Sequence, residues 1–255
     1  MSDKPDGLVR VERASADLRA EWGRNAPGFV AWVRKPNHDS YDRFHRDQFL
    51  PIVPEPGRRT LDLGCGEGRL SRDLQALGHR MVGLDASHAM AEAAHAADAS
   101  IPVCRADAQR IAFADATFDL VIAFMSLQDV DDAVTAIREA ARVLEPKGRL
   151  CLAIVHPLNS AGAFESDEPD SAFRIDGSYL DTSFRQDTVV RDGLEVVFAS
   201  AHRPLQFYVD AITEAGLVVD RLAETGVPDD AVTQARSRRW QRVPLFLHVR
   251  AVKPA

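Results

Sequence analysis

The chain has 255 residues, of which 45% are hydrophobic and 27% are charged, and its 38 acidic and 31 basic residues give a net charge of −7. This composition is typical of a folded globular protein and excludes a disordered, collagen-like or disulfide-scaffold chain. No apolar run reaches the roughly 18 residues that a membrane span needs, and the polar start lacks the apolar stretch of a secretion signal. We therefore expect a cytoplasmic protein with no membrane partner.

The net negative charge bears on the possible binding partners, and the cysteines bear on the cellular compartment. Binding to a phosphate backbone requires clustered basic side chains, so a nucleic-acid partner is not expected. The one basic cluster is interpreted as a solvated face and consists of Arg236, Arg238, Arg239 and Arg242. The cysteines are few, odd in number and widely spaced, which predicts buried free thiols in a reducing compartment; they are Cys65, Cys104 and Cys151. No metal-ligand spacing is present, and we predict no metal site.

The first 57 residues are predicted to form a helical cap segment. Asp39 or Ser40 is a suitable N-cap for a helix that carries its apolar side chains on one side. Those side chains belong to Tyr41, Phe44, Phe49 and Ile52. Three prolines between residues 51 and 56 then end the helical pattern.

Residues 58–156 alternate between short apolar strands and helices, which predicts the core of the fold. Parallel strands need crossover connections, and helices then cover both faces of the sheet. A helix is predicted from Arg69 to Leu77, and others begin after Ser87 and at Asp131 or Asp132. The predicted strands are Thr60–Gly64, Met81–Asp85, Pro102–Arg105, Phe118–Met125 and Arg149–Val155.

Residues 157–203 interrupt this alternation and are predicted to form an inserted cover. The segment DTVVRDGLEVVF reads as a hairpin turning at Asp192-Gly193, because Asp-Gly supplies the positive φ angles of a type I′ turn. Residues 204–255 then complete the core sheet of a single domain. They are predicted to contain the helix Pro204–Ala215 and the strands Leu217–Leu222 and Leu245–Val252.

The most informative motif is TLDLGCGEG, residues 60–68, with glycines at positions 64, 66 and 68 between a strand and a helix. Glycine lets a ligand approach the backbone, and the amides at a helix start favour an electron-rich group. Asp85 follows 21 residues after Gly64, at the end of the next strand, where a carboxylate can accept both hydroxyls of a ribose. Asp107 follows the third strand and can accept from an adenine amino group. Together these features predict an adenosine site.

The segments LDLGCGEG, VGLDAS, RADAQRIAFADATFDLVIAFMSLQDVDD and REAARVLEPKGRL resemble the class I S-adenosylmethionine-dependent methyltransferases, specifically their bacterial small-molecule branch. The resemblance is strong over residues 58–155 and weak over 204–252. It implies an α/β, Rossmann-like fold with a seven-stranded, mostly parallel sheet, helices on both faces and an antiparallel last strand. It also implies S-adenosylmethionine as the methyl donor.

The resemblance assigns donor contacts residue by residue. Asp62 and Gly64 fall where the family holds the methionine part of the donor. Cys65 and Gly66 fall in the backbone turn. Asp85 falls at the acid that binds the ribose.

The adenine and methyl ends of the donor are assigned in the same way. Ala86 and Met90 flank the adenine, and Asp107 and Ala108 fall at the contact to its amino group. The residues at the end of the fourth strand, where the methyl group meets the acceptor, are Phe124, Ser126 and Gln128. Gln128 stands where the family often has histidine or another polar residue.

Two other classes of protein are weighed against a methyltransferase. A nicotinamide-dependent oxidoreductase also needs a ribose acid, but its G-x-G-x-x-G fingerprint requires a third glycine where this chain has Arg69. Asp107 also has no evident role in a dinucleotide site. A donor-binding protein without catalysis is the second alternative, and only the intact donor loop and the cover segments speak against it.

Methyl transfer requires alignment of two reactants in a dry site, and a positioned base helps where the nucleophile loses a proton. The predicted catalytic candidates are His156 after the fifth strand, His202 before the last helix, and Tyr41, which with His45 can close over the donor. Each has a structural alternative: a strand-end cap, a helix entrance and core packing, respectively. The acids Asp129, Asp131 and Asp132 are interpreted as loop and capping residues.

The acceptor is expected to be a small apolar or aromatic molecule, methylated on oxygen, nitrogen or carbon. The cover segments have aromatic residues but no substrate motif; in the insertion these are Phe164, Phe173, Tyr179, Phe184 and Phe198. Trp22, Phe29 and Trp32 either line the acceptor pocket or pack in the core. A monomer or a homodimer is expected.

Overall fold

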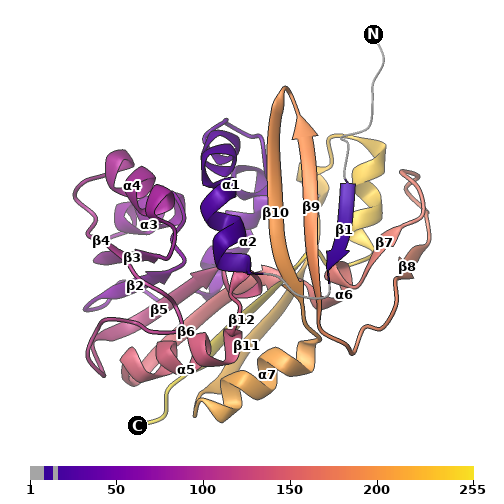
Figure 1. The fold of residues 1–255 in the computed structure, drawn as a ribbon. Helices are drawn as coiled ribbons and strands as arrows, with labels where there is room; N and C mark the ends of the chain where they lie inside the picture. The colour runs from indigo at the N-terminus through magenta and orange to yellow at the C-terminus, as the bar shows by residue number, and fades with distance from the viewer. Residues whose placement is uncertain (1–8, 14–16) are drawn as a thin grey trace.

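The computed structural model describes residues 9–13 and 17–255 and contains a seven-stranded sheet with the spatial order β11-β12-β6-β5-β2-β3-β4 (Figure 1). The strands β2 to β6 pair in parallel, whereas β12 runs antiparallel to both β6 and β11. The predicted mostly parallel sheet with an antiparallel last strand is therefore confirmed. The seven strands are β2 (Thr60–Leu63), β3 (Met81–Asp85), β4 (Val103–Arg105), β5 (Phe118–Phe124), β6 (Leu144–Val155), β11 (Val218–Thr225) and β12 (Phe246–Val252).

Helices cover both faces of this sheet, as predicted, because its central strands are apolar on both sides. Val121 and Ala123 of β5 pack in the cluster that contains α5 (Ala133–Val143) and α7 (Leu205–Glu214). Leu120 and Ile122 pack on the opposite face, against α3 (Arg69–Ala76) and residues 41–52. All four β5 side chains are buried. The remaining core helix, α4 (His88–Ala97), begins at Ser87, whose hydroxyl accepts a hydrogen bond from the Met90 amide.

The N-terminal cap is helical but not built as the sequence predicts. α1 spans Leu18–Val33. Residues 41–52 form a π-helix (Tyr41–His45), a single turn of α-helix, α2 (Arg46–Phe49), and a 3-10 turn (Leu50–Ile52) rather than one α-helix. Pro51 lacks the N–H that a continuing α-helix would use, which explains the tightened end. Asp39 rather than Ser40 accepts from a helix-start amide, that of Tyr41, at 3.0 Å.

The insertion forms a cover joined to the start of the chain. β9 (Ser183–Arg191) and β10 (Leu194–His202) make the predicted hairpin, and Asp192 and Gly193 have φ angles of 50° and 78°. The sequence does not predict β1 (Val9–Arg13), which pairs antiparallel with β9. α1 lies alongside β10, so the three strands and α1 stand together above the sheet (Figure 1). Three short elements complete the insertion: α6 (Pro157–Ser160), β7 (Gly162–Phe164) and β8 (Phe173–Ile175).

The fifth core strand is longer than predicted. β6 begins at Leu144, whereas the sequence predicts a start at Arg149 because Pro146 and Gly148 suggest a loop. The backbone of this region is tied to the end of the chain, since the Lys147 amide donates to the Lys253 carbonyl at 2.8 Å and Lys253 donates to Gly148 at 2.9 Å. Long-range pairing thus overrides the local turn residues.

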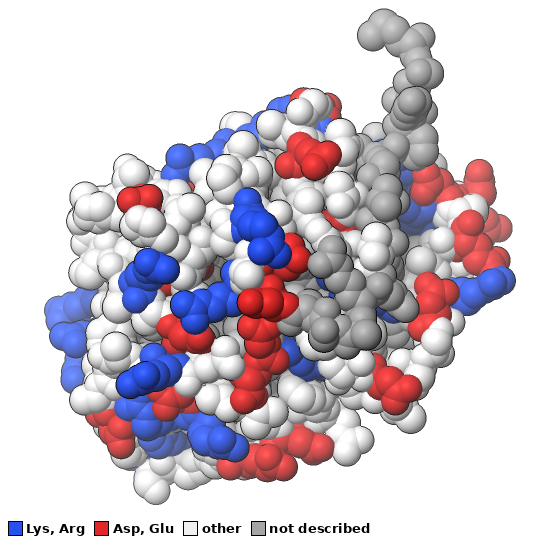
Figure 2. Space-filling view, viewed as in Figure 1, with Lys and Arg blue, Asp and Glu red and all other residues white. Residues whose placement is uncertain are grey.

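Charged residues of both signs are interspersed on the face of the molecule seen in Figure 2. The basic cluster near the C-terminus is partly engaged by the insertion: Arg239 donates to Asp167, and Arg242 donates to the Ser171 carbonyl at 2.9 Å. These arginines lie in or beside the 3-10 helix Ala235–Gln241, and a shorter 3-10 turn spans Asp229–Ala231. In the parts of the chain that the structure describes, no helix is long and apolar enough to cross a membrane.

Candidate active site

The glycine turn after β2 folds back onto the end of β3. Gly64, Gly66 and Gly68 have φ angles of 76°, 57° and 82°, a region that side chains with a Cβ rarely adopt. The amides of Gly64 and Cys65 donate to the carbonyl of Leu84 at 2.8 and 2.9 Å. The three glycines are therefore required by the backbone of the turn itself, which leads directly into α3.

Gly64 also has no room for a side chain, because Ser126 lies close to it. A Cβ at this position would lie 2.5 Å from the Cβ of Ser126, which real atoms do not tolerate. The Ser126 hydroxyl donates to the Leu63 carbonyl at 2.6 Å, so the ends of β2 and β5 are bonded together here. This contact brings the residues after β5 to the glycine turn.

Asp85 joins the end of β3 to the same turn. Its two carboxylate oxygens accept from the amides of Gly66 at 2.8 Å and Ser87 at 2.9 Å. Burial raises the pKa of Asp85, and the two amides act in the opposite direction by favouring the charged form. Each oxygen of a carboxylate can accept a second hydrogen bond, and Asp85 lines the cavity described below, so the pair suits two neighbouring hydroxyls of a ribose.

Asp107 follows β4, which is the neighbour of β3 at the edge of the sheet. Its carboxylate accepts from the Gln109 amide at 2.9 Å and from the Arg19 guanidinium at 3.1 Å. Because Arg19 comes from α1 and is half exposed, this pair is a solvent-screened link between the cap and the core.

Asp62 is a fully enclosed carboxylate beneath the turn. It accepts from the Ser71 hydroxyl at 2.5 Å, and burial raises its pKa to about 6. A carboxylate in this state gains strongly from a nearby cation, because ionisation then restores a charge pair in place of lost hydration. Its position suits the ammonium of an amino acid.

These groups line one cavity of about 460 Å³. The donor-contacting residues predicted from the sequence all lie in its wall: Asp62, Gly64, Cys65, Gly66, Asp85, Ala86, Met90, Asp107, Ala108, Phe124, Ser126 and Gln128. Buried carboxylates, a glycine turn that lets a ligand approach the backbone, and the apolar side chains of Ala86 and Met90 in the same wall suit the amino acid, ribose and adenine parts of S-adenosylmethionine. The residues present therefore fit this donor.

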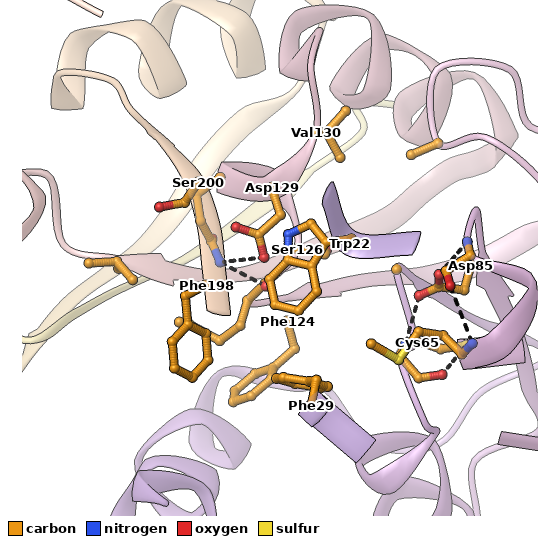
Figure 3. A pocket seen from close by; sticks show the side chains of 18 of the residues that line it. Trp22, Phe29, Cys65, Asp85, Phe124, Ser126, Asp129, Val130, Phe198 and Ser200 are labelled. Atoms are coloured by element: carbon orange, nitrogen blue, oxygen red, sulfur yellow. Dashed lines mark hydrogen bonds between the residues drawn. The ribbon is translucent and has the colours of Figure 1, made fainter. Parts of the chain in front are cut away.

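The cavity continues into an aromatic half under the cover. Trp22 and Phe29 from α1 and Phe198 from β10 contact one another edge to face, with ring centroids 5.2 to 6.4 Å apart. The Trp22 ring nitrogen donates to the Ala199 carbonyl at 2.9 Å, which fixes the indole. Figure 3 shows these rings and Phe124 around one space, with Asp85 and Cys65 on the other side. Trp32, by contrast, packs against His38 outside the cavity wall.

None of the three predicted catalytic side chains lines this cavity. Tyr41 is buried and donates to Asp73 at 2.7 Å, and burial raises the pKa of its hydroxyl far above the usual value. Its ring lies under the Arg69 guanidinium. The neighbouring His45 does reach the cavity, although its ring is stacked on Phe246.

His156 serves as a cap at the junction of β6 and α6. Its Nδ1 accepts from the Leu158 amide at 3.0 Å, and its Nε2 lies 2.8 Å from a carboxylate oxygen of Glu224. Burial lowers the pKa of His156, whereas Glu224 opposes that shift. Both ring nitrogens are thus engaged by the protein, and the predicted catalytic role receives no support from this geometry.

His202 reaches the cavity through another residue. Its Nε2 lies 2.9 Å from the Tyr179 carbonyl, which can only accept. Nε2 therefore donates there, and Nδ1 accepts from the Ser160 hydroxyl at 2.7 Å. Ser160 lines the cavity. His202 is therefore a positioning residue for a hydroxyl in the cavity wall.

The sequence does not single out several polar residues of the aromatic half. Arg185, Asp187 and Ser200 come from the inner face of the β9–β10 hairpin, and Asp129 comes from the loop after β5. The alternation along β10 is the signal that was available, because Phe198, Ser200 and His202 must share one face of a strand. Which face turns inward depends on the packing of α1.

Similarity to known proteins agrees with this geometry. The family model described as a methyltransferase domain matches residues 61–152. The ubiquinone biosynthesis O-methyltransferase of Parvibaculum lavamentivorans is 33% identical over 182 residues, which are 64% of this chain and 71% of that protein. The demethylmenaquinone methyltransferase of Corynebacterium kroppenstedtii is 35% identical over 99 residues, or 39% and 42% of the two chains.

Among solved structures, an S-adenosylmethionine-dependent methyltransferase from Mesorhizobium loti superposes with a TM-score of 0.67 at 25% identity, covering 81% of this chain and 96% of that one. The chain belongs to the class I S-adenosylmethionine-dependent methyltransferases. It spans about half the length of the first curated relatives that it matches. The matched region is centred on the donor half, as the resemblance predicts.

Proposed function

We propose that this protein transfers the methyl group of S-adenosylmethionine to a small molecule with an apolar or aromatic frame. The observation that carries the proposal is the continuity of one cavity between a donor half, with Asp85 and the glycine turn, and an aromatic half, with Trp22, Phe29 and Phe198. The curated relatives named for quinone biosynthesis act on compounds of this general kind, which supports the proposal.

The chain's own residues account for the tasks that such a reaction sets. When bound, S-adenosylmethionine supplies an electrophilic methyl group on a positively charged sulfur. Asp85 and the Gly66 turn hold the nucleoside, and Asp62 pairs with the ammonium of the amino-acid part. The aromatic half excludes water and orients the acceptor, which converts a bimolecular encounter into an aligned one.

The two alternatives are less well supported. An oxidoreductase would need a pyrophosphate site on the glycine turn, but Arg69 occupies the third glycine position and the relatives are methyltransferases. A donor-binding protein without catalysis would need no second pocket, whereas here the aromatic half extends the donor half.

The test uses S-adenosylmethionine labelled in its methyl group, the purified protein and a metabolite extract of the host. We expect label to move into one small-molecule product, which mass spectrometry then identifies. The Asp85→Ala variant serves as the control for donor-dependent transfer. Donor binding without any labelled product would favour the non-catalytic alternative, and absence of donor binding at saturating concentration would overturn the proposal altogether.

A further inference from the structure

Of three acids that follow β5, one has no structural task. Asp131 accepts from the Leu18 amide at 2.8 Å, which docks the start of α1, and Asp132 caps α5 by accepting from the Thr135 amide at 3.0 Å. Among the residues that the structure describes, Asp129 accepts only from the Gln128 side chain, at a long 3.4 Å. A carboxylate in a cavity wall without a backbone partner is available for a ligand.

The backbone around Asp129 is fixed from outside the loop. The buried guanidinium of Arg203 donates to the carbonyls of Leu127 at 3.2 Å, Val130 at 2.7 Å and Asp131 at 3.1 Å. These hydrogen bonds bracket Asp129 without engaging its carboxylate. The loop therefore presents the Asp129 side chain from a rigid support, as a residue that acts on a ligand requires.

Gln128 provides a second acceptor at the same place. Its Nε2 donates to the Met125 carbonyl at 2.7 Å, which leaves Oε1, itself buried, with no hydrogen-bond partner among the described residues. Gln128 is only 5% exposed and lines the cavity. The unpartnered Oε1 of Gln128, next to a carboxylate that accepts one long hydrogen bond, calls for a ligand that brings hydrogen-bond donors.

The part of the cavity wall that contains Asp129 holds aromatic rings together with polar side chains, among them Arg185, Asp187 and Ser200. Figure 3 shows its carboxyl group close to Trp22 and Ser200, with the rings of Phe124 and Phe198 across the same space. Burial raises the pKa of Asp129 well above its usual value; the cation of Arg203 acts against this shift, and the Asp85 charge adds to it. The buried hydroxyl of Tyr208, on α7, lies on the Arg203 side, and burial raises its pKa as well.

We propose that Asp129 accepts the proton that the methyl acceptor loses, and that the acceptor presents an O–H or N–H group on a frame held between Trp22, Phe124 and Phe198. This inference rests on the proposed function. In the step, the O–H or N–H bond breaks and its proton moves to a carboxylate oxygen of Asp129. The electron pair on oxygen or nitrogen forms the new bond to the methyl carbon, and the carbon–sulfur bond breaks with its pair left on sulfur.

The positive charge of the methyl donor favours the ionised form of Asp129, which is the form that can accept a proton. Before the methyl donor binds, the burial of Asp129 favours the protonated carboxyl. A sulfonium in the same low-dielectric space favours the carboxylate, because opposite charges attract strongly there. Asp129 therefore becomes a proton acceptor when the methyl donor is bound, and it returns to the neutral form when the sulfur loses its charge.

The experiment compares S-adenosylmethionine with its demethylated product, S-adenosylhomocysteine, which lacks only the methyl group and the positive charge on sulfur. Titration calorimetry at neutral pH in buffers of different ionisation enthalpy measures the protons released on binding. The proteins are the wild type, Asp129→Asn and the matched control Asp132→Asn, in which asparagine still caps α5.

We expect the wild type and Asp132→Asn to release more protons with S-adenosylmethionine than with S-adenosylhomocysteine. In Asp129→Asn this difference should vanish while both compounds still bind. An equal difference in Asp129→Asn, or no difference in the wild type, would overturn the assignment. Failure of both compounds to bind the wild type would instead overturn the proposed function, and the assignment with it.

Discussion

The carboxylate of Asp85 lies 2.8 Å from the amide nitrogen of Gly66, so the acid that ends β3 is bonded directly to the glycine turn that follows β2. The sequence separates these residues, but the parallel pairing of the two strands brings their carboxyl ends together. This contact orients the acid before any ligand is present, which reduces the ordering that ligand binding must otherwise cause.

Replacing Asp85 with alanine is expected to weaken donor binding by tenfold or more. The loss removes charge-assisted hydrogen bonds to the ribose and also releases the Gly66 amide from its partner. Titration calorimetry with S-adenosylhomocysteine measures the change. Asp98→Ala, which removes a partly exposed acid at the end of α4, is the control and should leave the affinity unchanged. Equal affinities for Asp85→Ala and the wild type would contradict the ribose assignment.

Alanine at Gly64 should destabilise the protein more than alanine at Gly66. Both residues have a positive φ, which costs a non-glycine residue on the order of 1–3 kcal/mol. At Gly66 the nearest atom to an added Cβ is a ring carbon of Phe29 at 3.8 Å, whereas at Gly64 the Cβ of Ser126 lies only 2.5 Å away. Denaturant unfolding compares the two variants. If Gly64→Ala were as stable as Gly66→Ala, the ends of β2 and β5 would be able to move apart at little cost in free energy.

Donor affinity should fall as the pH drops below about 6. The pKa of Asp62 is raised by burial to about 6, so below this pH the free protein holds Asp62 neutral and loses the charge that attracts the donor's ammonium. The decline should approach about tenfold per pH unit if only the ionised form binds. Calorimetry between pH 5 and 8 tests this, and Asp62→Asn, which can still accept from Ser71, should show a flatter profile. If the affinity of Asp62→Asn fell just as steeply with pH, the pH dependence would have to come from a titratable group other than Asp62.

The two histidines should respond differently to substitution by alanine. His202→Ala removes the acceptor of the Ser160 hydroxyl and should lower acceptor turnover. His156→Ala removes the side chain that caps α6 and should lower the unfolding free energy by about 1 kcal/mol. Neither should alter donor affinity. Labelled-donor turnover with the identified acceptor, together with thermal unfolding, separates these effects. A turnover loss in His156→Ala, without a loss in His202→Ala, would restore the predicted catalytic role of His156.

The donor half was largely predictable because its residues are determined locally. Strand, glycine turn and helix follow one another within a few residues, and parallel pairing then fixes which strand ends meet. For this reason all the predicted donor contacts, from Asp62 to Gln128, lie in one cavity wall. Even here the extent of β6 was wrong, because the pairing of Lys147 with Lys253 spans more than a hundred residues.

The acceptor half was not predictable from local patterns. The hairpin was confirmed, yet its pairing with β1 and its packing against α1 decide which of its side chains face the cavity. Of the five aromatic residues in the insertion that suggested an acceptor pocket, only Phe198 lines it. Asp129 looked like one of three equivalent loop acids, and only the hydrogen bonds of Asp131 and Asp132 set it apart.

The antiparallel pairing of β1 with β9 has a consequence for engineering this enzyme family. If the insertion alone were replaced by that of a relative, β1 of this chain would have to pair with a β9 of different sequence. The side chains along the β1–β9 pairing would then no longer match. The beginning of the chain and the insertion must therefore be exchanged together as one module. The contact between Asp85 and Gly66 stays within the core of such a chimaera, but the exchanged module must keep Arg19, whose guanidinium donates to Asp107.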